Sequence, residues 1–202
     1  MDSTALLTDD EIVALCVADG RPWPIGLSTV EPTAEEFAKA GVRGMRSLMV
    51  RRLAGGDAEK DGMRPNEMIA NDVAAFLDAD NRVGAYIAPA ADPSKLGGAA
   101  VTAARTEHGW VVDTATAAGV HALRRATADE ARTAVLELAE NIYNGTFFDD
   151  EERRSEWVCV LRFGPNAAGA LTIGHGTASG EVNGAAVQAW DPDIVRAAFS
   201  AA

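Results

Sequence analysis

Residues 37–88 read FAKAGVRGMRSLMVRRLAGGDAEKDGMRPNEMIANDVAAFLDADNRVGAYIA, and this stretch decides the fold. Apolar residues recur in it three and four positions apart, the spacing that places side chains on one face of a helix. The pattern predicts a helix over Phe37–Leu53 and another over Asn66–Leu77, separated by a polar break at Gly55–Met63. A strand is predicted at Arg82–Ala88. Two helices with one apolar face each are expected to pack against each other and onto a sheet.

Helix starts are marked by the pattern T-x-x-E, which begins at Thr8, Thr33 and Thr127. In such a capping box the threonine hydroxyl accepts a hydrogen bond from the third helical amide, and the glutamate accepts one from the amide of the capping residue. Each pattern precedes an apolar helical stretch, so it predicts a helix. We expect the helix after Thr33 to end near a glycine cap at Gly55 and Gly56.

Short apolar stretches separated by tight turns dominate the rest of the chain and indicate an antiparallel sheet. The predicted strands are Arg82–Ala88, Ala99–Thr106, Gly109–Ala115, Gly119–Ala126 and Trp157–Phe163, with two or three more in Gly169–Ile173 and Gly180–Trp190. The order of strands followed by a helix at 82–143 recurs at 156–199. The predicted fold class is therefore α+β, an antiparallel sheet flanked by helical bundles with a quasi-twofold internal repeat. We expect one domain over 1–202, with a sub-boundary near 149–154, where the charge run DDEERR lies.

The formal net charge of −12 argues against two classes of partner. Affinity for nucleic acid comes largely from Lys and Arg, and an acidic chain is not attracted to an anionic membrane. No stretch approaches the ~20 apolar residues of a membrane span, and the N-terminus has no basic, apolar leader, so the cytoplasm is predicted. Cys16 and Cys159 are predicted to be buried thiols and not a disulfide.

The sequence holds no catalytic signature and predicts no catalytic, metal-binding or cofactor-binding residue. Its histidines, His108, His121 and His175, lack the spacing of a metal site, so each is expected to be hydrogen-bonded inside the fold or exposed. The loop Gly174–Gly180 is the stretch most like a site, and the alternative function is a small-molecule-binding or enzymatic α+β domain that uses it. A winged-helix DNA reader is a third hypothesis, but its recognition helix, Asn66–Leu77, carries no Lys or Arg.

Several short motifs follow one another along the first 143 residues, and their order is informative. They are Leu7-Thr8-Asp9-Asp10-Glu11, similar to L-T-x-D-E; Pro22-Trp23-Pro24-Ile25; the helix end Arg46–Leu53, similar to L-x-x-R-G-L; Phe76–Val83, similar to L-x-x-P-D-R-x-V; Gly109-Trp110-Val111-Val112; and the helix Ala128–Tyr143. In this order, residues 8–143 resemble the EspG family of type VII (ESX) secretion-associated proteins of actinobacteria. Arg52 departs from the pattern, because the family usually has glycine there, and the part after Asp149 matches less well.

The resemblance implies a non-enzymatic cytosolic chaperone that binds helical secretion substrates of the PE/PPE type. If the second half is truncated, the surface for such a client is missing or is rebuilt in a homodimer. Trp23, Trp110 and Trp157 are the predicted partner-binding residues, since exposed aromatic side chains would anchor a partner helix; the alternative is that all three lie in the core. The break at Gly55–Met63 is expected to be exposed and open to a partner.

Overall fold

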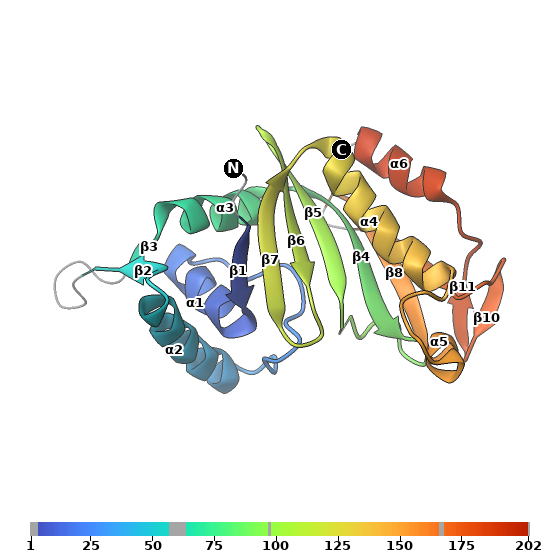
Figure 1. Cartoon of the computed structure of the whole chain (residues 1–202), viewed down its shortest axis with the longest axis horizontal. Coiled ribbons are helices and arrows are strands. Elements are labelled where there is room, and N and C mark those ends of the chain that lie inside the picture. Colours follow the sequence, from blue (N-terminus) through green and yellow to red (C-terminus); the bar gives the residue numbers. More distant parts are fainter. Residues whose placement is uncertain (1–3, 57–63, 97, 166–167, 202) are drawn as a thin grey trace.

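A computed structural model describes residues 4–56, 64–96, 98–165 and 168–201. Its centre is a seven-stranded antiparallel sheet with the strand order β1-β7-β6-β5-β4-β8-β9 (Figure 1). The strands are β1 (Ala5–Thr8), β4 (Asn81–Pro89), β5 (Ala100–Thr106), β6 (Gly109–Ala115), β7 (Val120–Ala126), β8 (Trp157–Pro165) and β9 (Gly169–Gly174). Two small ribbons stand beside it: β2 (Ala54–Gly55) with β3 (Arg64–Pro65), and β10 (Gly180–Val182) with β11 (Ala185–Val187).

Six helices are seen in the described part of the chain, and they cover both faces of the sheet (Figure 1). They are α1 (Asp9–Asp19), α2 (Ala34–Val50), α3 (Glu67–Asp78), α4 (Ala128–Tyr143), α5 (Glu151–Glu156) and α6 (Pro192–Ala201). Successive strand residues point to opposite faces. On β6, Val112 therefore joins the core under α4 and α6, while Val111 joins the core under α1 and α3. The predicted α+β fold with helices flanking an antiparallel sheet is confirmed.

The two halves of the chain meet where β4 pairs with β8, and the quasi-twofold repeat stays a prediction. Both strands have nine residues, and they pair antiparallel along their whole length, with Ala85 opposite Leu161. Each strand is preceded by a helix and followed by antiparallel strands and a closing helix, α4 in the first half and α6 in the second. The charge run at 149–154 lies at α5, and the sheet continues on both sides of it.

The three capped helix starts are found where T-x-x-E predicts them. Thr8 and Thr127 form complete capping boxes, and the Thr33 hydroxyl accepts from the Glu36 amide. The predicted end of α2 is wrong: the helix stops at Val50, with Arg51 as its cap, three residues before Leu53. A glycine cap at Gly55 is not needed, because Arg52 itself takes the left-handed conformation, with φ 57°. The short strands β1, β2 and β3 carry too few residues for a period-two pattern and were not predicted.

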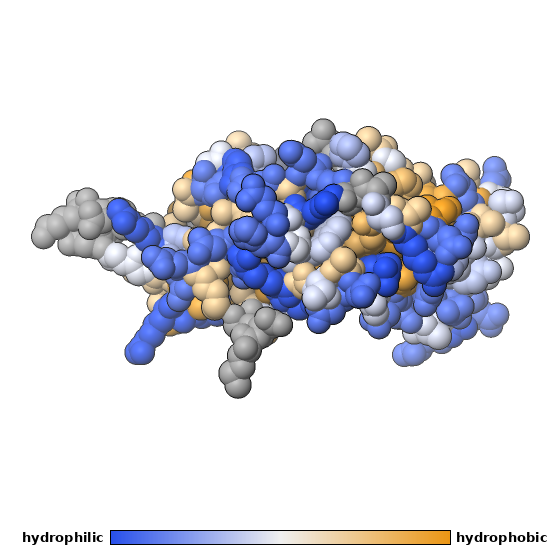
Figure 2. Space-filling view, turned by 90° about the horizontal axis from the view of Figure 1, so that it is seen from above, coloured by the Kyte–Doolittle hydropathy of each residue, from blue (hydrophilic) through white to orange (hydrophobic). Residues whose placement is uncertain are grey.

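The surface agrees with the acidic composition. Seen from above, the molecule is largely hydrophilic, and the apolar residues of this face gather toward the end that carries α6 (Figure 2). Among the described residues, no helix is both long and apolar enough to cross a membrane. Residues 57–63 of the break that was expected to meet a partner lie outside the described residues.

Candidate functional site

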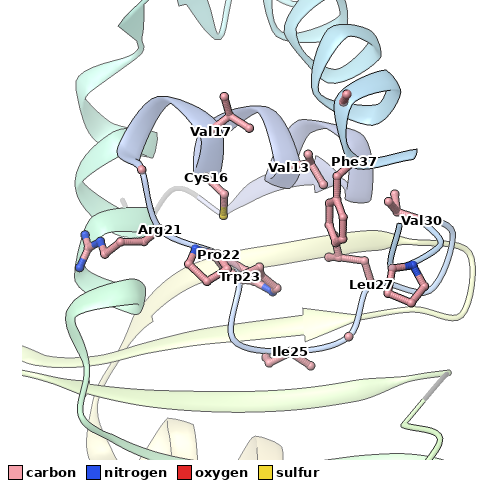
Figure 3. A pocket seen from close by; sticks show the side chains of 14 residues that line it. Val13, Cys16, Val17, Arg21, Pro22, Trp23, Ile25, Leu27, Val30 and Phe37 are labelled. Carbon is pink, nitrogen blue, oxygen red and sulfur yellow. The ribbon is translucent and has the colours of Figure 1, made fainter. Parts of the chain in front are cut away.

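An apolar cavity of about 560 Å³ lies between α1, the segment 20–32 and the start of α2. The helix α1 contributes Val13, Cys16 and Val17 on one side, and the segment from Arg21 to Leu27 forms the opposite side (Figure 3). The further lining residues are Gly20, Val30, Pro32, Phe37 and Ala38. Pockets of this size hold small ligands or a few side chains of a protein partner.

Large apolar side chains at this cavity are exposed to solvent. Val17 is 69% exposed and Phe37 is 40% exposed. Further along α2, Val42, Met49 and Val50 are exposed as well. The charged residue in the lining, Arg21, is already paired with Asp19, at 2.5 Å between Nε and Oδ1, and with Asp78. An apolar occupant would therefore gain from leaving water without displacing an ion pair.

A buried charged cluster fixes the wall of the cavity to the sheet. His121 on β7 lies between two carboxylates: its Nε2 is 2.7 Å from Asp9 Oδ1, and its Nδ1 is 2.9 Å from Asp113 Oδ2. The other oxygen of Asp9 accepts hydrogen bonds from the Thr29 amide at 2.6 Å and from its hydroxyl at 2.8 Å. Thr29 lies in the segment that lines the cavity, so the cluster ties this segment to the start of α1 and to β6 and β7.

Burial and hydrogen bonding oppose each other in this cluster. Burial alone would lower the pKa of His121, but its hydrogen bonds to Asp113 and Asp9 raise that pKa to about 9. Burial likewise works to raise the pKa of Asp9, yet the hydrogen bonds from His121 and Thr29 hold it below its usual value. For Asp113 burial is the stronger effect, and it raises the pKa. At neutral pH His121 is therefore an imidazolium held between carboxyl groups.

Of the three predicted tryptophan contacts, Trp23 is the one that lines the cavity. Its indole stacks on Phe76 at 4.5 Å between ring centroids and meets the edge of His121 at 6.0 Å. The side chain is half-buried, and its Nε1 has no hydrogen-bond partner in the described structure. Trp23 thus contacts both the charged cluster and the apolar cavity. The sequence around it, with Pro22 and Pro24, gave no sign of these contacts.

Trp110 requires a correction. Its indole is 6% exposed and packs against Phe199 at 4.7 Å, inside the core beneath α4 and α6. A side chain with so little free surface cannot anchor a partner in this fold, so the alternative of a core position holds for it. Trp157 is half-buried at the start of β8, near Phe148 at 5.9 Å, and lies apart from Trp23. Its contact with a partner stays a prediction.

The loop Gly174–Gly180 has a structural task. His175 Nδ1 is 3.0 Å from the carbonyl oxygen of Tyr143, and the Gly176 amide donates to the same oxygen at 2.8 Å. Tyr143 is the last residue of α4, so the loop satisfies a carbonyl that the helix end leaves open. The hydrogen bond to Tyr143 therefore gives His175 a structural role that needs no ligand.

The other histidine and the two cysteines that the sequence singled out lie away from the cavity or contribute only a buried thiol to it. His108 is exposed in the turn between β5 and β6. Cys16 and Cys159 are free and buried, as predicted, and burial raises the pKa of each thiol to about 12. Within the described ranges no group of His, Cys, Asp and Glu side chains has the arrangement of a metal site.

Sequence reasoning missed the charged cluster, and the reason is topological. Asp9 and His121 are 112 positions apart, and the strand β1, which pairs with β7, brings the start of α1 beside His121. Asp113 and His121 lie on neighbouring strands of the predicted hairpin, so their proximity could have been read from the sequence. The usable signal was a histidine and an aspartate inside otherwise apolar strands.

Among known proteins, this chain matches solved structures but not family models or curated sequences. No family model matches the sequence, and no curated protein does. Among solved structures, the fold is similar to a chain in the structure of the Mycobacterium tuberculosis type VII secretion system chaperone EspG5 in complex with the PE25–PPE41 dimer. The TM-score is 0.51 at 11% sequence identity, and the match covers 98% of this chain and 95% of that chain. The fold is therefore EspG-like.

Proposed function

We propose that this protein is a non-enzymatic, cytosolic chaperone of a type VII (ESX) secretion system that binds helical protein substrates of the PE/PPE type. The observation that carries the proposal is the similarity of fold, over nearly the whole chain, to a type VII secretion chaperone whose structure was solved with a PE–PPE dimer. The order of motifs along residues 8–143 supports the same function independently of the fold.

The proposed contact surface is the apolar cavity with the exposed side chains beside it. A helix that presents apolar residues on one face can dock in an apolar groove, and its anchors recur three and four positions apart. Phe37 and Val17 offer exposed apolar surface at this cavity, and Trp23 lies in its wall. We retain Trp23 as a proposed partner contact and leave Trp110 out.

The test uses the PE25–PPE41 dimer and any PE–PPE heterodimer that the genome of this protein encodes. Binding to the purified chain is measured by isothermal titration calorimetry, and the stoichiometry by light scattering, which also reports whether the free chain is a homodimer. A saturable complex with at least one heterodimer is expected. If the folded chain binds none of them, the proposed function is wrong.

A matched pair of substitutions locates the surface. Phe37 is 40% exposed and Phe147 is 37% exposed, and Phe147 lies after α4, outside the lining of the cavity. Phe37→Asp is expected to weaken binding about tenfold or more, since a central apolar anchor contributes more than ~1 kcal/mol. Phe147→Asp is expected to leave binding unchanged. The reverse result would move the contact surface to the α4–α5 end.

A further inference from the structure

A second cavity, of about 440 Å³, lies on the face of the sheet opposite α4 and α6, and polar and apolar residues line it in nearly equal parts. Two arginines from neighbouring strands line it, Arg82 on β4 and Arg162 on β8, together with the Tyr86 hydroxyl-bearing side chain. Pro24, Ile25, Gly26, Ser94 and Leu96 complete its wall. In a chain of net charge −12, a cavity lined by two cations and by no carboxylate is unexpected.

The register of the sheet brings these three side chains together. Arg82, Gly84 and Tyr86 alternate along β4 and so share one face, and Arg162 lies directly opposite Gly84 on β8. A Cβ on Gly84 would lie 2.4 Å from the Tyr86 hydroxyl oxygen. The glycine therefore leaves room for the tyrosine ring to lie along the strand, which puts its hydroxyl over Gly84, between the two arginine positions.

One nitrogen of each arginine lacks an acceptor. The buried Nε atoms of Arg82 and Arg162 have no hydrogen-bond partner in the described structure, and neither side chain forms an ion pair there. Other arginines in the described residues also lack an ion pair, but Arg82 and Arg162 are the two whose Nε is buried without a hydrogen-bond partner there. A buried donor without an acceptor is costly, so two such donors at one cavity favour an acceptor as its ligand.

The surroundings fix the donors in place. Arg82 Nη2 donates to the carbonyl of Phe76 at 2.7 Å, which holds its guanidinium beneath the last turn of α3. Thr102 Oγ1 donates to the Tyr86 hydroxyl at 3.0 Å, which leaves the phenolic proton to donate elsewhere. Burial raises the pKa of Tyr86, so the hydroxyl keeps its proton at neutral pH.

We infer that this cavity binds a small ligand through an oxyanion, a carboxylate or a phosphate, held by Arg82, Arg162 and the Tyr86 hydroxyl. Guanidinium groups bind both kinds of oxyanion with paired N–H donors. The apolar wall formed by Ile25 and Leu96 suits the uncharged remainder of the ligand. This inference does not depend on the proposed function.

The experiment titrates the purified full chain with inorganic phosphate and, separately, with succinate, against sodium chloride at equal ionic strength. Binding is followed by the Nε–H resonances of the arginine side chains in nuclear magnetic resonance spectra and by the melting temperature. Saturable shifts of the Arg82 and Arg162 resonances with either anion are expected, and the probe that saturates first identifies the kind of oxyanion. If neither anion gives a saturable shift beyond that of chloride, the inference is wrong.

Substitutions separate this site from general charge effects. Arg162→Gln replaces the charged guanidinium by a neutral amide. We expect it to weaken binding of the saturating anion about tenfold or more, because a charged hydrogen-bond donor is lost. Arg162→Lys keeps the charge and should bind with intermediate affinity. Arg196→Gln, on α6, removes one cation elsewhere and should bind like the unchanged protein. Equal affinity for Arg162→Gln and Arg196→Gln would overturn the inference, and the titration of the unchanged chain stands even if a variant fails to fold.

Discussion

Arg52 adopts a backbone conformation that L-amino acids seldom take. Its φ of 57° lies in the left-handed region, and it follows the last turn of α2. The Arg52 amide donates to the Met49 carbonyl at 3.0 Å, and the Leu53 amide donates to the Leu48 carbonyl at 2.8 Å. These two bonds form a Schellman motif, whose left-handed position usually holds glycine. The sequence departs from the EspG-like pattern at this very position.

Replacing this arginine by glycine is therefore expected to stabilise the protein. Arg52→Gly should raise the free energy of unfolding by about 1 kcal/mol, since relief of the left-handed strain exceeds the added chain entropy of glycine. Urea denaturation measures the change. Arg46→Gly, in the interior of the same helix, is the matched control and should lower stability by about 0.8 kcal/mol. An Arg52→Gly variant no more stable than the unchanged chain would contradict the strain argument.

The buried cluster around His121 makes stability depend on pH. The pKa of His121 is about 9 in the fold, above the ~6.5 of an unfolded histidine. Its contribution to stability is therefore fully present below pH ~6.5 and is lost as the pH rises through about 9, an effect on the order of 3 kcal/mol. The free energy of unfolding, measured by urea denaturation at intervals of about half a pH unit between about pH 6 and 9.5, tests this dependence.

A glutamine at this position removes that dependence. His121→Gln leaves Asp9 and Asp113 without their buried cation and should cost about 3–5 kcal/mol at neutral pH. The variant should keep only the weaker slope caused by Cys16 and Cys159, whose raised pKa values act in the same direction. His108→Gln, at an exposed turn, should behave like the unchanged chain. A full slope in His121→Gln would assign the pH dependence to other groups.

At the scale of elements, α1 and α2 are joined by a close backbone contact and a buried carboxylate. Glu11 is fully buried and accepts hydrogen bonds from the Ser47 hydroxyl at 2.7 Å and from Arg51 Nη1 at 2.6 Å. A Cβ on Gly44 would lie 1.8 Å from the carbonyl oxygen of Asp10. The two helices can approach this closely only because residue 44 has no side chain.

Two glycines of α2 give a matched test of that packing. Gly44→Ala is expected to destabilise the protein by about 3 kcal/mol or more, because the backbone of α1 must move to admit a methyl group. At Gly41 the added Cβ would meet Val13 at 3.8 Å, an ordinary contact. Gly41→Ala should therefore raise stability by about 0.5–1 kcal/mol through helix propensity. Thermal unfolding compares the two, and equal effects would refute the close contact.

Which elements could be predicted follows from the range of the interactions that form them. Helix starts depend on a hydroxyl and a carboxylate three residues apart, so Thr8, Thr33 and Thr127 were found from the sequence. The end of α2 was misjudged because it depends on the backbone conformation of Arg52, which no side-chain pattern reveals. The strand β1 exists because it pairs with β7, and that partner is more than 100 positions away.

At the scale of the whole molecule, the two halves of the chain share one sheet. The seam is the pairing of β4 with β8, and Cys159, Leu161 and Ile173 from the second half lie in the same core as α4 from the first. The cluster of charged residues at 149–154 marks a helix, α5, between the halves. We therefore expect that neither half buries its apolar face alone.

Cleavage between Asp149 and Asp150 tests this dependence. A fragment of residues 1–149 is expected to lack a cooperative thermal transition by circular dichroism, because the edge of β4 and half of one core would be exposed. Expressed together, the fragments 1–149 and 150–202 should form a folded complex. A cooperative transition in 1–149 alone would show that the sub-boundary near 149–154 separates two independent units.

The sequence by itself determined the α+β class, the order of most elements and the EspG-like resemblance, because helix caps, apolar periodicity and turn residues are local signals. Only the tertiary structure decided that Trp110 is buried while Trp23 lines a cavity, and that Arg82, Tyr86 and Arg162 converge. These placements depend on strand register and on contacts between residues far apart in the chain. A sequence pattern fixes which face of a strand a residue occupies, but the packing of the other elements decides whether that face is covered.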